Sequence, residues 1–134
     1  MAVRQDLAQL IHKDIPGFER MAGHSKPVPI YLSEEICPDV TFRIAAVDVS
    51  QHICSPIANP HTHDHPEVYL AISEREGDVV FEVTLDGEAF LVESPAAVYI
   101  PAGMPHAFRT LTAKNKPSFF LGIFLDYVNR KLSG

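Results

Sequence analysis

Four polar residues at every second position constrain what this chain can fold into: His61, His63, His65 and Glu67. In extended backbone, successive side chains point to opposite faces, so side chains two residues apart share a face. A row of imidazoles ending in a carboxylate is costly to pack against apolar neighbours, but it is favourable around a divalent transition metal. The spacing therefore predicts an extended segment that carries a metal site.

The rest of the chain is patterned as short strands separated by turns. Asp86-Gly87 joins the alternating stretches 79–85 and 88–92 and is a strong hairpin signal. Further strands are predicted over residues 41–49, 68–72, 97–100, 108–111 and 119–127, and the two prolines in 24–29 are typical of an extended edge segment. Many short strands with few helices favour an all-β antiparallel barrel or sandwich.

The N-terminal stretch has a different pattern. Leu7, Leu10 and Ile11 fall on one stripe at helical spacing, and Pro16-Gly17 breaks that pattern. Residues 1–22 are therefore expected to form one short amphipathic helix and its exit.

Composition narrows the range of partners. The 134 residues are enough for a single domain, and 46% of them are hydrophobic, as in a globular protein with a real core. A net charge of −6 with only 11 Lys and Arg residues argues against nucleic-acid binding. No apolar run approaches the roughly twenty residues of a membrane span, and the N-terminus lacks a signal peptide's apolar centre, so a cytoplasmic location is expected.

A fourth ligand must come from outside the histidine run, and His106 is the candidate because it follows the tight turn 101–105 at the start of a predicted strand. Pro66 disturbs regular pairing, so His65 could leave the face that its spacing predicts. Three imidazoles and one carboxylate suit Fe(II), Mn(II), Ni(II), Co(II) or Zn(II), and the absence of thiolates disfavours a structural zinc site. The isolated histidines His12, His24 and His52 are interpreted as solvated or locally hydrogen-bonded.

Two motifs resemble those of the cupin superfamily. The first is His-x-His followed, after three intervening residues, by Glu, and it covers residues 61–67; the second is Pro-x-Gly-x-x-His over residues 101–106. The resemblance spans roughly residues 41–125 and implies a small antiparallel jelly-roll barrel of six to eight strands. It also implies one metal ion held by His61, His63, Glu67 and His106. The expected domain boundaries are 1–30 for the helix and arm, 31–128 for the cupin barrel and 129–134 for a tail.

The resemblance also shapes the functional expectation. A three-histidine, one-glutamate set resembles that of cupin dioxygenases, which favours Fe(II) and a small carbonyl, enol or phenolic substrate. The same ligands serve isomerases without a redox step, where His65 or Tyr69 could shuttle a proton. A non-catalytic module that binds metal and a small molecule is the remaining alternative.

Three other side chains have a functional and a structural interpretation. Tyr69 and Phe108 share a face with the ligands and could line a substrate cavity, although ordinary core packing is the more common role of such aromatic residues. Arg43 could anchor a substrate carboxylate, or it could pair with an acid. The stretch 119–125 is apolar on both faces, which indicates that its outer face is covered by the N-terminal helix or by a second subunit. Family resemblance favours a homodimer.

Overall fold

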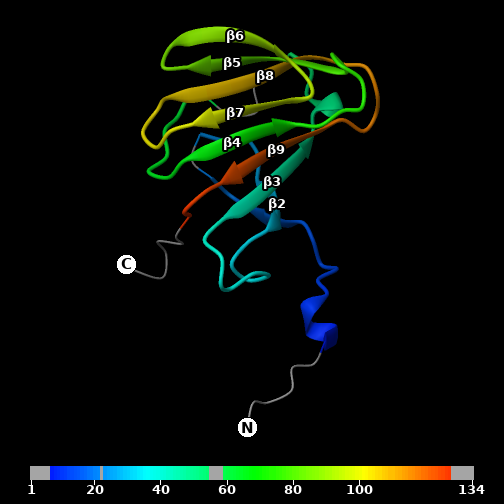
Figure 1. The fold of residues 1–134 in the computed structure, drawn as a ribbon, viewed down its shortest axis with the longest axis vertical. Helices are drawn as coiled ribbons and strands as arrows, with labels where there is room; N and C mark the ends of the chain where they lie inside the picture. The colour runs from blue at the N-terminus through cyan, green and yellow to red at the C-terminus, as the bar shows by residue number, and fades with distance from the viewer. Residues whose placement is uncertain (1–6, 22, 55–58, 128–134) are drawn as a thin grey trace.

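Two antiparallel β-sheets form the protein in the computed structural model, which describes residues 7–21, 23–54 and 59–127 (Figure 1). The larger sheet has the strand order β1-β2-β3-β9-β4-β7, and the smaller one has the order β6-β5-β8. The bounds of the strands are β1 Gly17–Glu19, β2 Val28–Leu32, β3 Arg43–Asp48, β4 Glu67–Ala71, β5 Val79–Leu85, β6 Glu88–Glu93, β7 Ala96–Ile100, β8 His106–Ala113 and β9 Phe119–Phe124. The all-β jelly-roll prediction is confirmed.

The core lies between the two sheets. Tyr69 and Phe120 from the larger sheet meet Phe81 and Val83 from β5 in one buried cluster. Strict alternation of side chains produces this cluster, because β5 is buried at every second residue from Val79. The interior is therefore built mainly from one face of each sheet.

The predicted hairpin is confirmed. Leu85 pairs with Glu88, and the two residues between them have positive φ, 49° at Asp86 and 86° at Gly87. Positive φ at both central residues matches the right-handed twist of the flanking strands. The other predicted strands are also present, with ends that differ by a few residues.

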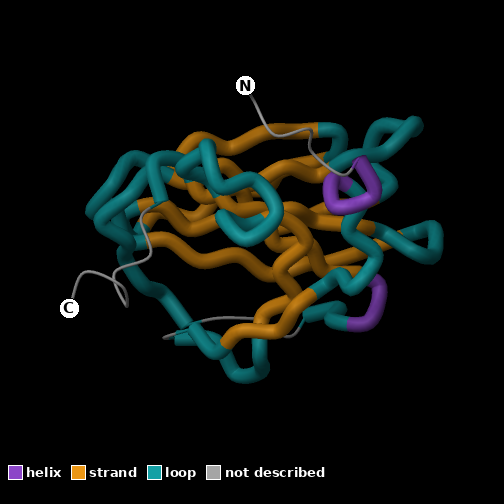
Figure 2. The backbone as a smooth tube through the Cα atoms, turned by 90° about the horizontal axis from the view of Figure 1, so that it is seen from below, coloured by secondary structure: helices purple, strands orange, loops and turns teal. Residues whose placement is uncertain are grey.

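The N-terminal helix is not formed as predicted. In the described part of that segment, helical structure is limited to one 3-10 turn, η1 (Leu7–Leu10), and a second such turn, η2 (Val49–Gln51), follows β3 (Figure 2). Leu7 and Leu10 are 65% and 57% exposed, so the apolar stripe has no core to pack on, and short isolated helices are marginal in water. The chain then enters the larger sheet as β1.

Two further expectations concern the ends of the chain. The predicted edge segment 24–29 includes the first two residues of β2, which is not an edge strand because it pairs with both β1 and β3. Residue 30, the expected domain boundary, falls within β2. Residues 1–6 of the predicted helix and the predicted tail 129–134 lie outside the described residues. None of the helical segments described is long and apolar enough to cross a membrane.

The outer face of the larger sheet is apolar across four strands. The registers of β7, β4, β9 and β3 place its residues in two cross-strand rows, Tyr99-Val68-Ile123-Ile44 and Ala97-Leu70-Leu121-Ala46. Tyr99 is 59% exposed on this face. The sheet therefore presents apolar side chains on both sides, as the sequence of β9 predicts.

Candidate metal centre

The backbone brings the two histidine motifs together. The His61 amide donates to the His106 carbonyl at 3.1 Å, and the His106 amide donates back to the His61 carbonyl at 3.0 Å. The Gly103 amide, in the turn before β8, donates to the His63 carbonyl at 2.7 Å. These main-chain bonds fix the spacing of the ligand residues independently of any metal.

Three imidazoles converge at this point. One ring nitrogen from each of His61, His63 and His106 lies within 4.8 Å of the others. Nδ1 of His61 donates to the Asn59 carbonyl at 2.7 Å, and Nδ1 of His106 donates to the Met104 carbonyl at 2.9 Å. A proton on Nδ1 leaves the lone pair on Nε2, which is the form that ligates a metal.

Glu67, at the start of β4, completes the cluster. Its Oε1 lies 3.4 Å from Nε2 of His63 and 3.1 Å from Nε2 of His106. Two ligand atoms about 2.1 Å from one ion are separated by about 3.0 Å at a right angle and by about 3.4 Å at a tetrahedral angle. The observed spacings therefore match the edges of a coordination polyhedron.

The hydrogen bonding of these atoms supports the same interpretation. His63 Nε2, His106 Nε2 and Glu67 Oε1 are buried and have no well-oriented hydrogen-bond partner among the described residues. Buried polar atoms are nearly always satisfied, and leaving one unpaired costs about 1–3 kcal/mol. A cation placed between them would satisfy all three at once, so the residues fit a metal ion.

The charges of the cluster are mutually dependent. Burial alone would raise the pKa of Glu67, but the His106 and His63 rings outweigh it and lower the pKa, so the carboxyl stays ionised. Burial alone would lower the pKa of His106, but Glu67 and the Met104 carbonyl raise it. Burial lowers the pKa of His61 and keeps that ring neutral. A metal would therefore compete with a proton chiefly at His106.

Gly122 of β9 leaves room for the Glu67 carboxylate. A Cβ at Gly122 would lie 3.0 Å from Glu67 Oε2, closer than ordinary side-chain contacts. In the sheet register, Gly122 is flanked by Ala45 and Tyr69. The absence of a side chain at this position is thus part of the site.

His65 lies beside the cluster and not within it. Its ring stacks on His63 at 4.8 Å with an interplanar angle of 12°, and it contacts Phe124 and Tyr127 edge-on. Burial lowers the pKa of His65. The ring is thus neutral near pH 7 and packs against a candidate ligand.

Tyr69 lies in the core, whereas Phe108, which contacts it, lines a cavity. Tyr69 is 4% exposed and packs on Phe108 and Phe120 in the core, with its ring centroid 5.8 Å from that of His106. Burial raises the pKa of the Tyr69 phenol, which stays protonated. Phe108 lines a cavity that reaches Glu67.

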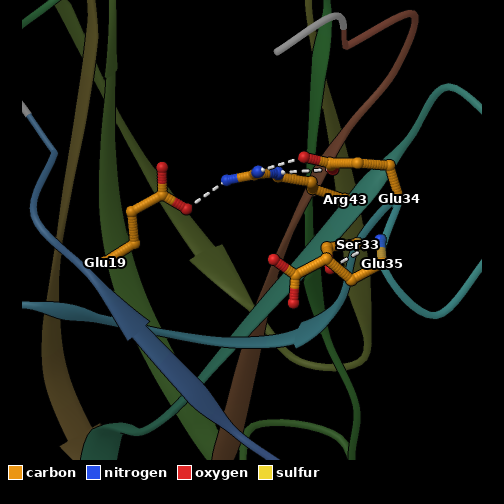
Figure 3. A network of polar contacts seen from close by, with 5 residues as sticks. All are labelled: Glu19, Ser33, Glu34, Glu35 and Arg43. Carbon is orange, nitrogen blue, oxygen red and sulfur yellow. Dashed lines mark hydrogen bonds and ion pairs between the residues drawn. The ribbon is translucent and has the colours of Figure 1, made fainter. Parts of the chain in front are cut away.

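Arg43 pairs with acids, as one of its two interpretations predicts. Figure 3 shows its guanidinium between Glu19 and Glu34. Nη2 lies 2.7 Å from Glu34 Oε1, a second bond joins Nε to Oε2 of the same carboxylate, and the Tyr127 ring lies 4.4 Å from Cζ. The side chain is only 5% exposed. These contacts occupy the guanidinium.

The sequence analysis missed three residues near the centre. His24 contacts the His61 ring at 5.2 Å, and His24, Lys26 and His52 line the same cavity as Glu67. Isolated residues carry no periodic signal: His24 and Lys26 lie in the segment before β2, and His52 directly follows η2. The interpretation of His24 as merely solvated or locally bonded is therefore incomplete.

Comparison with solved structures identifies the architecture. A cupin-like protein from Thermotoga maritima aligns with a TM-score of 0.59 at 12% identity, over 85% of this chain and 80% of that one. A cupin protein from Bacteroides fragilis aligns at 0.54 and 15% identity, over 85% and 86%. The chain has a cupin fold.

Two other solved structures align over a similar share of the chain. KdgF from Halomonas sp. aligns with a TM-score of 0.54 at 16% identity, over 86% of this chain and 90% of that one. Streptomyces PAC13, solved with uridine, aligns at 0.59 and 10% identity, over 88% and 82%. Neither the protein-family models nor the curated proteins gave a match. The fold and the three-histidine cluster together support a metal-binding cupin.

Proposed function

We propose that this cupin binds one divalent transition metal ion through His61, His63, Glu67 and His106. The observation that carries the proposal is the group of buried atoms on three of these residues that face one another at ligand spacing and have no well-oriented hydrogen bond within the described part of the chain. The donor set contains nitrogen and oxygen and no thiolate, which favours Fe(II) over a structural zinc ion. Zinc, nickel, manganese and cobalt share these donor preferences and are the competing ions.

The proposed activity is that of a dioxygenase-type oxidoreductase acting on a small carbonyl, enol or phenolic compound. When bound, the ion supplies Lewis acidity and, in the case of iron, redox chemistry. Phe108 and Phe124 line the adjoining cavity together with Glu67. His65, whose pKa is lowered, would accept a proton, and the neutral Tyr69 phenol would donate one.

A non-redox isomerase or lyase is the second candidate, because the same His65 and Tyr69 roles suffice for proton transfer without dioxygen. His65→Phe keeps the aromatic contact with His63 and removes the acid–base group. If His65 carries a proton, this variant loses about 10²–10⁴-fold in turnover while its metal content is unchanged. Loss of metal instead would assign His65 to positioning His63.

Metal analysis and oxygen uptake test the proposal in sequence. Protein purified without a metal-affinity tag is analysed for bound elements, then loaded with Fe(II) under anaerobic conditions and given dioxygen with a panel of small diketones and catechols. The expected result is about one ion per chain and substrate-dependent oxygen uptake, both abolished by His106→Gln and retained by His12→Gln. Product formation without uptake would indicate isomerase or lyase chemistry, and binding without turnover would indicate a binding module.

We also propose a homodimer that uses the apolar outer face of the larger sheet. The two cross-strand rows on β7, β4, β9 and β3 contain no charged residue. Contiguous apolar faces of this kind mark association sites in soluble proteins. Leu121→Glu should convert the dimer to a monomer in analytical ultracentrifugation, whereas Thr84→Glu, on β5 of the smaller sheet, should not. A monomeric parent protein at micromolar concentration would contradict the proposal.

A further inference from the structure

A cavity of about 380 Å³ adjoins the candidate metal centre at Glu67. Its inner wall is aromatic and comes from β8 and β9, where Phe108 and Phe120 stack at 4.1 Å with an interplanar angle of 14° and Phe124 continues the wall. Ala45 and Val47 of β3 form another apolar side. Small-molecule sites have this combination of volume and apolar lining.

The segment before β2 and the first two residues of β2 form a further wall. Residues 24–29 all line the cavity, and the segment is held in place where the Asn59 amide donates to the Gly23 carbonyl at 2.9 Å. His24 packs its ring edge-on against His61, so this wall touches the candidate metal centre directly. The cavity is thus enclosed by a part of the chain that lies outside both cupin motifs.

The charged lining of the cavity has a clear sign. Lys26, an exposed residue, is the only lysine or arginine among the described lining residues, and His24 and His52 add two imidazoles. Glu67 is the sole carboxylate among the described residues that line it. A divalent ion would more than neutralise Glu67, so the ion, Glu67 and Lys26 together would carry a net charge of about +2. Such a cavity attracts anions and disfavours cations.

We infer that the ligand of this site is a small planar carboxylate, aromatic or enolic, whose carboxylate is recognised by Lys26 and whose ring or conjugated body lies against Phe108 and Phe120. The inference rests on the proposed metal-dependent function and specifies its substrate class. A flat, apolar body suits the stacked phenylalanine wall, because aromatic contacts favour planar partners. A negative head group is favoured because the charges of the ion and Lys26 outweigh that of Glu67.

Paired ligands test this inference without requiring turnover. The Co(II)-loaded protein is first analysed for metal content and then titrated by calorimetry with salicylate and with salicylamide, which share a ring and a hydroxyl group but differ in charge. Salicylate is expected to bind at least about tenfold more tightly, since a charge-assisted hydrogen bond is added. Lys26→Met should remove most of that difference, whereas Lys114→Met, an equal charge change after β8, should preserve it.

The outcomes separate the two proposals. Absence of bound cobalt would overturn the metal centre itself. Bound cobalt with equal affinity for the two compounds, or with no binding of either at millimolar concentration, would overturn the carboxylate inference alone. Retention of the difference in Lys26→Met would also overturn the role of Lys26, and unchanged salicylamide binding in that variant serves as the check that the cavity is intact.

Discussion

Two buried charges lie in the same cross-strand row on the inner face of the larger sheet, and their surroundings are opposite. The row runs Ile100-Glu67-Phe124-Arg43. Arg43 is enclosed by two carboxylates and the Tyr127 ring. Glu67 faces two imidazole nitrogens that, like its own Oε1, lack a well-oriented partner among the described residues. One charge is closed within the protein and the other is open to a further ligand.

The difference teaches how to tell a structural charge from a functional one. Burying a charge is costly in either case, and complete pairing with protein groups offsets that cost at Arg43. At Glu67 the carboxylate and two imidazole nitrogens point toward a common centre, and a cation there would complete their pairing. Arg43 and Glu67 are both buried, and both contact oppositely charged or polar groups. They differ in how those partner groups are oriented.

The largest expected effect separates the two regions by metal content. His106→Ala removes one convergent nitrogen and should lower the bound metal from about one ion per chain to below about a tenth, since a three-ligand remnant binds weakly. Arg43→Met should leave the metal content unchanged. Elemental analysis of both variants after dialysis measures this. Metal loss in Arg43→Met would break the distinction between the two charges.

The free energy of unfolding, unlike the metal content, should depend on Arg43. Arg43→Met removes the guanidinium that Glu34 and Glu19 contact and should lower the free energy of unfolding by about 2–3 kcal/mol. The loss is less than for a fully buried pair because water still reaches both carboxylates. Arg109→Met breaks an exposed pair with Glu82 and should cost no more than about 1 kcal/mol. Urea titration of metal-free protein gives both values. Equal costs would show that the enclosure of Arg43 adds nothing.

Gly122→Ala sharpens the comparison at the open charge. The new Cβ would press on Glu67 Oε2 and displace the carboxylate, so metal affinity should fall about tenfold, as for other changes next to a ligand. Gly17→Ala in β1 is the matched control, because a Cβ there meets nothing within 4 Å. Competition with a chromophoric chelator measures the affinities. Equal affinities would indicate that Glu67 has room to move.

The smallest effect concerns Asp48, a half-buried charge that is also paired within the protein. Its carboxylate accepts hydrogen bonds from Ser50 N at 3.1 Å, Ser50 Oγ at 2.6 Å and Ser118 N at 3.0 Å. These bonds lower the pKa of Asp48, and the bond from the Ser50 hydroxyl contributes most. Asp48→Ala should cost about 1 kcal/mol at pH 7, whereas Asp39→Ala should cost almost nothing.

The pH dependence of the Asp48 effect has a definite sign. A carboxyl whose pKa is lowered in the folded state stabilises the protein above its unfolded pKa of about 3.9, and this stabilisation is lost as the pH falls through the folded pKa. The difference between wild type and Asp48→Ala in urea midpoints should thus be constant from pH 7 to pH 5 and shrink below about pH 4. A difference that grows on acidification would contradict the assignment.

Sequence periodicity predicted those parts of the molecule that depend on local geometry. Spacing of two residues predicted that His61 and His63 share a site with Glu67, but residues 62–66 are not in a strand and His65, at the same spacing, lies beside the cluster. The Asp86-Gly87 turn defines the β5–β6 hairpin because it follows from backbone dihedral preferences. His106 could be proposed because its turn delivers a strand start. The cross-strand convergence that makes these residues a cluster required the sheet register.

The sequence predictions that failed or stayed ambiguous depend on contacts between distant parts of the chain. Leu7 and Leu10 have helical spacing, but spacing stabilises a helix only when a core receives the apolar face. His24 and Lys26 have no sequence pattern, and they reach the cavity because β2 pairs with β3. The role of Arg43 was ambiguous in the sequence, since its partners Glu19 and Glu34 come from separate segments.

The reciprocal main-chain bonds between His61 and His106 have an evolutionary consequence. They hold two anchor points at a set spacing through amide and carbonyl groups that every residue except proline provides. Either imidazole can therefore be exchanged for another donor, or for an inert side chain, without dismantling the frame. A scaffold of this kind can drift between metals, or lose its metal altogether, through single substitutions at these two points.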